Sequence, residues 1–178
     1  MTLETKRLLL RPYEAGDWED YLAYFNDQEM WRMLGYRPFE HEEDFRGDFQ
    51  WRLENPGVTA LVLKESGRLI GHICAGGLYP PLLEREELRG KQGVSLSFSL
   101  HRDWRRQGLM REALVALLDE LFRAGALDFV NSGYFSFNEA SAALHRSLGF
   151  RPIFTHVIER NGETIEVIET ILERVNRG

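Results

Sequence analysis

The junction spanning residues 94–122 most constrains the fold of this chain. Residues 94–100, Val-Ser-Leu-Ser-Phe-Ser-Leu, alternate apolar and polar side chains, which is the period of a half-buried strand. A basic, glycine-containing turn follows at residues 104–110. The apolar residues after it repeat at helical spacing: Leu114, Leu117, Leu118, Leu121 and Phe122. Because the first N–H groups and the dipole of a helix attract anions, this strand–turn–helix junction predicts a phosphate-binding turn.

Composition limits the class of protein. With 178 residues, 43% of them hydrophobic and 28% charged, the chain is expected to form a single globular domain over residues 1–178. No secretory signal begins the sequence, and no apolar run approaches the roughly 20 residues of a membrane span. The single cysteine, Cys74, fits a reducing compartment, and the net charge of -6 argues against nucleic-acid binding. We therefore expect a cytoplasmic protein that binds neither nucleic acid nor a membrane.

The order of strand and helix signals predicts an α/β (α+β) fold. Its mixed, mostly antiparallel central sheet would have about seven strands, flanked by about four helices. The unit from residue 94 to 135 should form a right-handed parallel crossover. Asn161-Gly162 is a strong hairpin signal, and that hairpin offers an edge for pairing two chains into a homodimer. The expected strands are residues 7–11, 59–64, 69–74, 94–100 and 129–135 and the two runs flanking Asn161-Gly162; the expected helices follow Asp17, carry Phe45 to Leu53, end at Gly125, and span 139–148.

Three short motifs occur in a fixed order along nearly the whole chain. They are Arg7-Leu8-Leu9-Leu10-Arg11-Pro12, then Trp104-Arg105-Arg106-Gln107-Gly108-Leu109-Met110 followed by Glu112-Ala113-Leu114, then Asn138-Glu139-Ala140-Ser141 with Leu148-Gly149-Phe150. Together they resemble the GNAT superfamily of acyl-CoA-dependent N-acyltransferases, in the branch that acetylates ribosomal-protein N-termini. The resemblance implies a GNAT-like sheet and acetyl-CoA as co-substrate. Met110 departs from the family pattern, which has glycine or alanine there; its N–H can still donate if the side chain points into the helix–sheet interface.

The resemblance also implies which residues contact the cofactor. The pyrophosphate would lie on the turn, and the pantetheine arm would pair with backbone at the end of the preceding strand and approach Asn138. Each position also has a plain structural interpretation: a solvated helix start for the turn, core packing for Phe98 and Leu100, and an N-cap for Asn138. The implied cofactor-binding residues are Phe98, Ser99, Leu100, Arg105, Arg106, Gln107, Gly108, Leu109, Met110 and Asn138.

Two residues are candidates for proton transfer. The resemblance makes Ser141 the candidate proton donor to the departing thiolate, against its interpretation as a small surface residue. His72 lies on an expected strand, and an ordinary histidine pKa near 6.5 suits a general base. Its alternative is a buried, hydrogen-bonded histidine. The glutamate that many relatives carry before the loop is replaced by serines, so Glu84, Glu86 and Glu87, or a water chain, stay open as alternatives.

The acceptor side is marked by aromatic residues. Trp31 and Tyr36 belong to a segment, residues 30–39, that often walls the acceptor pocket in this family, although such residues also fill space between helices. Tyr134 would face the reacting centre. The remaining histidines lack metal-ligand spacing, and Cys74 belongs to no CxxC pair, so we expect no metal.

These features predict an acetyl-CoA-dependent N-acetyltransferase that transfers the acetyl group directly to a primary amine in a ternary complex. The acceptor would be a protein N-terminus or a small-molecule amine. The alternative is a non-catalytic acyl-CoA-binding sensor or regulatory module. A nucleotide phosphotransferase is disfavoured, because the sequence has no Gly-x-x-x-x-Gly-Lys-Ser/Thr loop and no acidic pair placed to hold magnesium.

Overall fold

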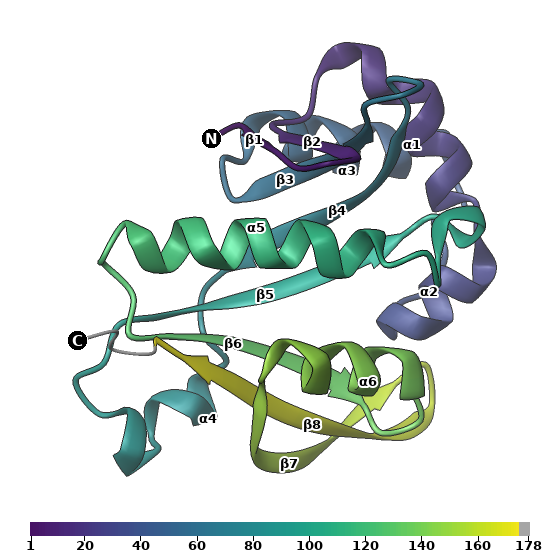
Figure 1. The fold of residues 1–178 in the computed structure, drawn as a ribbon. Coiled ribbons are helices and arrows are strands. Elements are labelled where there is room, and N and C mark those ends of the chain that lie inside the picture. Colours follow the sequence, from purple (N-terminus) through teal and green to yellow (C-terminus); the bar gives the residue numbers. More distant parts are fainter. Residues whose placement is uncertain (175–178) are drawn as a thin grey trace. The chain divides into compact units, whose positions relative to one another are not determined.

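The computed structural model describes residues 1–174 and confirms a mixed α/β fold with one sheet (Figure 1). The order of strands in the sheet is β1-β2-β3-β4-β5-β6-β8-β7. Eight strands and six α-helices are slightly more than the sequence predicts, because β1, α2 and α4 are short additions. The elements are β1 (Leu3–Glu4), β2 (Leu8–Arg11), α1 (Trp18–Phe25), α2 (Gln28–Leu34), α3 (Glu42–Glu54), β3 (Val58–Leu63), β4 (Leu69–Gly76), α4 (Pro80–Leu83), β5 (Gly93–Leu100), α5 (Leu109–Arg123), β6 (Phe129–Phe135), α6 (Glu139–Leu148), β7 (Arg151–Arg160) and β8 (Glu163–Glu173).

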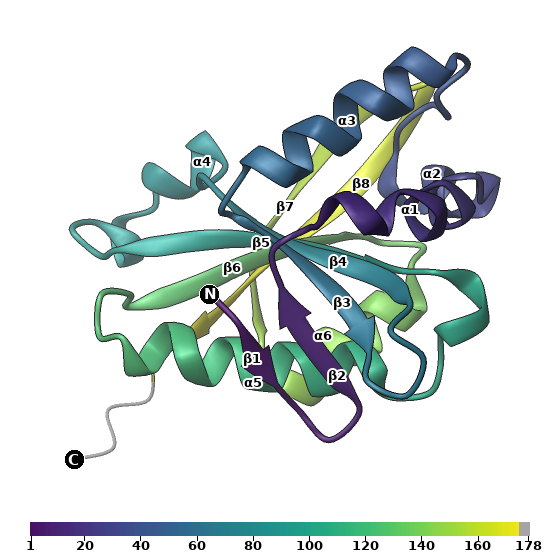
Figure 2. The same cartoon turned by 90° about the horizontal axis from the view of Figure 1, so that it is seen from above.

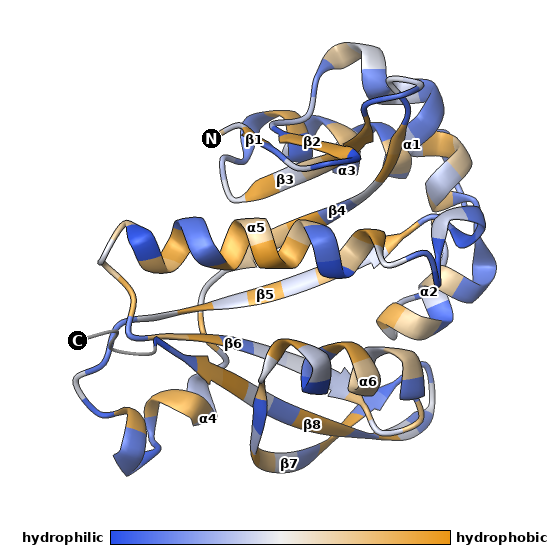
Figure 3. Cartoon of the chain, in the orientation of Figure 1, coloured by the Kyte–Doolittle hydropathy of each residue, from blue (hydrophilic) through white to orange (hydrophobic). Residues whose placement is uncertain are grey.

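The chain divides into two compact units whose segments alternate along the sequence. Unit 1 comprises Met1–Cys74 and Phe98–Ala116; unit 2 comprises Ala75–Ser97 and the chain from Leu117 onward. Strand β5 and helix α5 each contribute residues to both units. In Figure 3, α5 alternates between apolar and polar positions, as an amphipathic helix does.

Unit 1 is built on the antiparallel strands β1 to β4. Leu8 pairs with Leu63 across β2 and β3, and Ala60 pairs with His72 across β3 and β4. Figure 2 shows α1 and α3 on one side of β3 and β4, with the start of α5 on the other. The α1–α3 side is packed with buried aromatic rings, which fix these helices on the strands: Tyr13, Tyr21, Tyr24, Phe25, Trp31 and Phe49.

Helix α2 overlaps residues 30–39, the segment expected between two helices. Asp27 caps it by accepting a hydrogen bond from the Glu29 N–H at 3.0 Å, and Gly35 ends it in the left-handed region at φ 73°. Both end signals are present in the sequence. The helix is only seven residues long, which is why apolar periodicity does not reveal it.

Unit 2 contains the parallel pair that the sequence predicts. Strands β5 and β6 pair from Gly93↔Phe129 to Ser95↔Asn131. Strand β6 continues antiparallel with β8 as far as Phe135↔Val167. Within the described pairs, β6 therefore extends four residues beyond its last partner on β5.

The C-terminal hairpin forms where the sequence predicts it. Strands β7 and β8 meet at Asn161 and Gly162, which have φ of 54° and 80°. Positive φ at both central residues is the requirement of a type I′ turn. Among residues 1–174, no helix has the length and apolar character needed to cross a membrane.

Candidate active site

The turn before α5 has the backbone geometry of an anion site. Arg106 and Gly108 are exposed and adopt left-handed conformations, with φ of 62° and 75°. The first backbone bond into α5 runs from the Glu112 N–H to the Gly108 oxygen, at 3.0 Å. The N–H groups of residues 108–111 precede that bond, so they have no carbonyl one helical turn back. The turn therefore presents donors at the positive end of a helix dipole.

The side chains that follow the turn point into the protein. Leu109 and Met110 are 2% and 7% exposed. The methionine side chain therefore does not cover the turn, although this position departs from the family pattern.

Arg7, the residue before β2, supports this turn. Arg7 donates from Nη1 to the Gln107 oxygen at 2.9 Å and from Nε to Glu112 at 2.7 Å. Thr5 Oγ1 and the Arg7 N–H also donate to Glu112, at 2.5 and 2.8 Å. These contacts lower the pKa of Glu112, against the opposing effect of its burial. The negative charge of Glu112 is thus neutralised by Arg7. An unpaired carboxylate in the first turn of α5 would repel an anion bound at the helix start.

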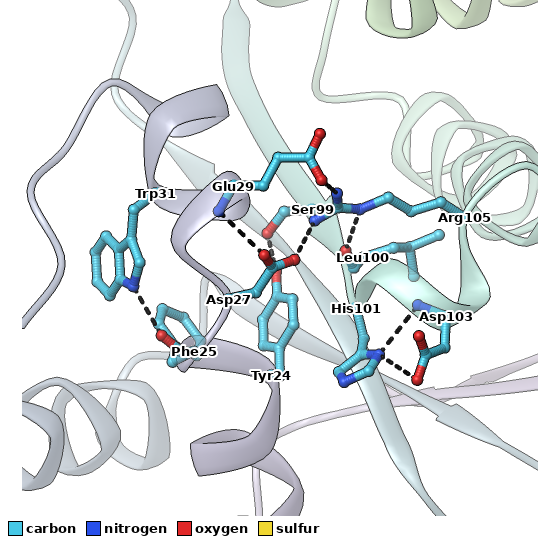
Figure 4. Close-up of polar contacts among 10 residues, drawn as sticks. All are labelled: Tyr24, Phe25, Asp27, Glu29, Trp31, Ser99, Leu100, His101, Asp103 and Arg105. Carbon is cyan, nitrogen blue, oxygen red and sulfur yellow. Dashed lines mark hydrogen bonds and ion pairs between the residues drawn. The ribbon is translucent and has the colours of Figure 1, made fainter.

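Arg105 is engaged in a different way from the sequence expectation. Its guanidinium donates to the Leu100 oxygen at 2.9 Å and forms ion pairs with Asp27 at 3.0 Å and Glu29 at 3.4 Å (Figure 4). Its charge is therefore matched by acidic residues at the start of α2. Arg106 is exposed, so of the two arginines it is the one whose charge is available to an anion at the turn.

The end of β5 is held by α1 and β4. Ser99 and Tyr24 hydrogen-bond through their hydroxyl groups (Figure 4), and burial raises the pKa of Tyr24 well above its ordinary value. A Cβ at Gly71 of β4 would lie 2.3 Å from the Ser99 oxygen, so only glycine allows this approach. Leu100 is buried, as the core interpretation requires, while Phe98 and Ser99 are half-buried.

His72 lies in the aromatic core of unit 1. Its ring stacks on Phe25 with centroids 5.8 Å apart and meets the Tyr24 ring edge-on at 5.6 Å. Burial, reinforced by the charge of Arg52, lowers its pKa well below the ordinary value. The imidazole is therefore neutral at neutral pH. Its Nδ1 atom is buried and has no hydrogen-bond partner in the described chain.

Of the three aromatic residues predicted for the acceptor side, the two in unit 1 occupy different environments. Trp31 is 5% exposed and donates from Nε1 to the Phe25 oxygen at 2.7 Å. Its ring also contacts Phe39 with centroids 4.7 Å apart, so it packs as core. Tyr36 is 54% exposed at the end of α2.

In unit 2, the start of α6 orients Ser141. Asn138 Oδ1 accepts the Ser141 N–H at 3.0 Å, so Asn138 is the N-cap and keeps Nδ2 as a donor. His145 Nδ1 lies 2.7 Å from the Ser141 carbonyl oxygen and 3.3 Å from its hydroxyl. Because the carbonyl can only accept, Nδ1 carries the proton, and the Ser141 hydroxyl hydrogen is directed elsewhere. Tyr134 packs against the His145 ring with centroids 5.0 Å apart.

A polar row in unit 2 was not predicted. Ser95 Oγ donates to Asn131 Oδ1 at 2.8 Å, and Asn131 Nδ2 donates to Glu169 Oε2 at 2.9 Å. His156 Nε2 lies 3.2 Å from Glu169 Oε1. The sequence does carry one signal of this row: Glu169 falls on the period-2 stripe of buried residues in β8, the others being Ile165, Val167 and Ile171.

Comparisons with known proteins agree on one family. Residues 7–151 match the family described as an acetyltransferase (GNAT) domain. An N-acetyltransferase 9-like protein of Caenorhabditis briggsae is 26% identical over 123 residues; these cover 66% of this chain and 61% of the relative, so the chain spans about three fifths of that protein's length. Two solved structures share the fold: a GNAT-family acetyltransferase from Bacillus anthracis (TM-score 0.84, 20% identity, 97% and 98% of the two chains) and a ribosomal-protein-S5-alanine acetyltransferase from Vibrio fischeri (TM-score 0.78, 19% identity, 100% and 99%).

Proposed function

Because this chain belongs to the GNAT family of acetyltransferases, we propose that it transfers an acetyl group from acetyl-CoA to a primary amine. It would act as one acyltransferase domain over residues 1–178, by direct transfer in a ternary complex. The observation that carries the proposal is the exposed turn with left-handed Arg106 and Gly108 ahead of α5. Such a turn fits a pyrophosphate, whose oxygens accept several N–H groups at once.

The cofactor contacts follow from the donors that remain available. On the turn, the backbone from Arg105 to Met110 would receive the pyrophosphate, with the Arg106 side chain adding charge. Phe98, Ser99 and Leu100 would offer backbone groups to the pantetheine arm. Asn138 would donate from Nδ2, since its Oδ1 already caps α6. The described residues contain no group of three His, Cys, Asp or Glu side chains that could hold a metal.

The reaction requires two proton movements. The amine must lose a proton before its lone pair attacks the thioester carbon, and the departing sulfur must gain one. Ser141 would supply the second proton, because its hydroxyl hydrogen is not used by His145. His72 would be the sequence-based candidate for the first step, as a neutral imidazole.

We propose that the acceptor is a protein N-terminus or a small-molecule amine. Of the three predicted residues, Tyr36 and Tyr134 would contact it, while Trp31 packs in the core. The fold similarity to a ribosomal-protein-S5-alanine acetyltransferase supports the first class. We further propose a cytoplasmic location. Strand β7 ends the sheet and leaves an edge on which a homodimer would form.

Calorimetric titration with acetyl-CoA tests the proposal directly. We expect saturable binding; no binding at millimolar cofactor would refute it. A screen of Ala- and Ser-initiated peptides, polyamines and aminoglycosides, read out as free CoA, then tests catalysis. Cofactor binding without CoA release from any amine would favour the sensor or regulatory module. Ser141→Ala should slow release; an unchanged rate across pH would exclude Ser141 as the acid.

A further inference from the structure

The polar row of Ser95, Asn131, Glu169 and His156 crosses four strands on one face of unit 2. Gly133 pairs with Glu169 across β6 and β8, and His156 pairs with Val167 across β7 and β8. Directly paired residues share a face, as do residues two apart on a strand. The side chains of Asn131, Glu169 and His156 therefore lie on the same face, one strand apart from one another.

The contacts of Glu169 fix the protonation of His156. The Glu169 side chain is only 9% exposed, and its two oxygens face Asn131 Nδ2 and His156 Nε2. A carboxylate accepts hydrogen bonds and cannot donate them, so Nε2 carries the proton. In the neutral imidazole, Nδ1 then bears the lone pair. An imidazole held this way by a buried carboxylate is oriented to accept a proton.

The Nδ1 atom of His156 has one long hydrogen bond. Its partner is the Tyr79 hydroxyl, at 3.5 Å. The Tyr79 ring stacks on the imidazole, with centroids 4.6 Å apart and planes at 21°. At 3.5 Å this hydrogen bond is at the limit of its range, so an amine nitrogen can displace the hydroxyl from Nδ1. The His156 side chain is 19% exposed.

The pair lies beside the part of β6 that extends beyond β5. A Cβ at Gly133 would be 2.9 Å from Glu169 Oε2, so the carboxylate lies directly over this glycine. Gly133 is exposed and lies two residues beyond Asn131, the last residue of β6 that pairs with β5. Tyr134 points to the opposite face, where it contacts His145 beside Ser141. The candidate acid and the His156–Glu169 pair therefore approach β6 from opposite faces.

We propose that His156, oriented by Glu169, is the general base for the acceptor amine; this inference rests on the proposed function. Nδ1 takes one proton from the amine nitrogen, whose lone pair forms the bond to the acetyl carbon. The carbon–sulfur bond breaks, the sulfur keeps its electron pair, and Ser141 protonates it. Water then receives the proton from the imidazolium and restores that of Ser141. His156 is the catalytic residue of the pair and Glu169 the positioning residue.

Charged groups approach His156 from two elements. Glu169 on β8 faces its Nε2 atom at 3.2 Å. Arg85, which follows α4, lies beside Phe154, whose ring is 5.4 Å from its guanidinium. Tyr79 adds a neutral hydroxyl. A histidine base predicts a rate that rises with pH to a plateau, and replacing the Glu169 carboxylate by an amide should shift this acidic limb of the profile.

The test compares variants with the unaltered full-length protein by two measurements. One is the pH–rate profile of kcat/KM with the best amine from the screen, and the other is acetyl-CoA affinity by calorimetry. His156→Gln should lower kcat by about 10²-fold and remove the acidic limb, with acetyl-CoA affinity unchanged. Glu169→Gln should shift the acidic limb of the pH–rate profile. Glu169→Asp, which keeps a carboxylate, should have its acidic limb closer to that of the unaltered protein. His41→Gln, at the exposed start of α3, is the matched control and should leave the profile unchanged. Thermal unfolding of each variant separates a folding defect from a catalytic one.

The outcomes distinguish the two levels of inference. If the unaltered protein acetylates an amine and folded His156→Gln keeps its acidic limb, the assignment of the base is refuted alone. Loss of the limb in His72→Gln but not in His156→Gln would transfer the role to His72. If the unaltered protein releases no CoA, both the proposed function and this inference are refuted. As an independent check, ¹⁵N NMR should find His156 protonated on Nε2 when neutral; protonation on Nδ1 would overturn the proposal.

Discussion

The support that Arg7 gives to the turn leads to a quantitative prediction about cofactor affinity. In the native protein the Arg7 guanidinium donates to the Gln107 oxygen and forms an ion pair with Glu112. Arg7→Ala removes both interactions. The two side chains are 42% and 20% exposed, so their ion pair contributes only about 0.5 to 1 kcal/mol to the free energy of unfolding. We therefore expect the variant to fold.

The effect on an anion at the turn is larger. Glu112 lies four residues after Gly108, which is about 6 Å along a helix axis. At that distance an unmatched carboxylate opposes a phosphate charge by about 1.4 kcal/mol if the effective dielectric constant is about 40, between the protein-surface and bulk-water values. Arg7→Ala should therefore weaken CoA binding about tenfold, and the loss should shrink in high salt.

Calorimetry with CoA measures this effect, and a second substitution isolates its cause. Arg7→Ala combined with Glu112→Gln removes the unmatched charge and should recover most of the affinity. Glu112→Gln alone should bind CoA no more weakly than the unaltered protein. The reasoning fails if Arg7→Ala binds CoA with unaltered affinity, or if the double variant binds no better than Arg7→Ala.

Three further predictions concern the same part of the chain and its stability. Gly108→Ala places a side chain at φ 75° and should cost about 1 to 2 kcal/mol locally, seen as weaker CoA binding with a modest drop in Tm; unchanged affinity would contradict the role of this geometry. Burial lowers the pKa of His72, so the unfolded chain binds the proton more readily: stability should be complete above about pH 6.5 and fall by up to about 1.4 kcal/mol per pH unit below it. His145, whose pKa is also lowered, adds to this slope, and urea denaturation of His72→Gln should show a shallower one. Arg105→Gln leaves the buried Asp27 carboxylate without its cation and should destabilise unit 1 by about 2 to 3 kcal/mol in urea; a cost below about 0.5 kcal/mol would show that this pair is not needed.

Local signals in the sequence predict much of the fold. The bounds of β6 and α6 coincide with the predicted segments, and the hairpin turn forms at Asn161-Gly162. These elements have strong periodicity, a capping asparagine or a turn pair that demands positive φ. Helix α2 was missed because seven residues are too few for a periodic pattern, although Asp27 and Gly35 mark its ends.

The site could be predicted only where its geometry is local. The turn at residues 105–110 depends on neighbours in sequence, and its backbone has the anticipated form. By contrast, Arg105 meets Asp27 from 78 residues away, and Glu169 meets Asn131 from 38 residues away. Those contacts depend on strand register and on which face each side chain takes. A one-residue change of register would reverse the faces, and no local pattern specifies it.

The alternation of the two units along the chain has a consequence for biosynthesis. Unit 1 needs residues 98–116 in addition to its first 74, and the segment between them belongs to unit 2. No cut in the chain therefore releases either unit as a continuous fragment. During translation, unit 1 can be completed only after the chain has been made as far as Ala116. The turn at residues 105–110 is thus among the last parts of unit 1 to be synthesised. Arg7, which supports this turn, is made about 100 residues earlier.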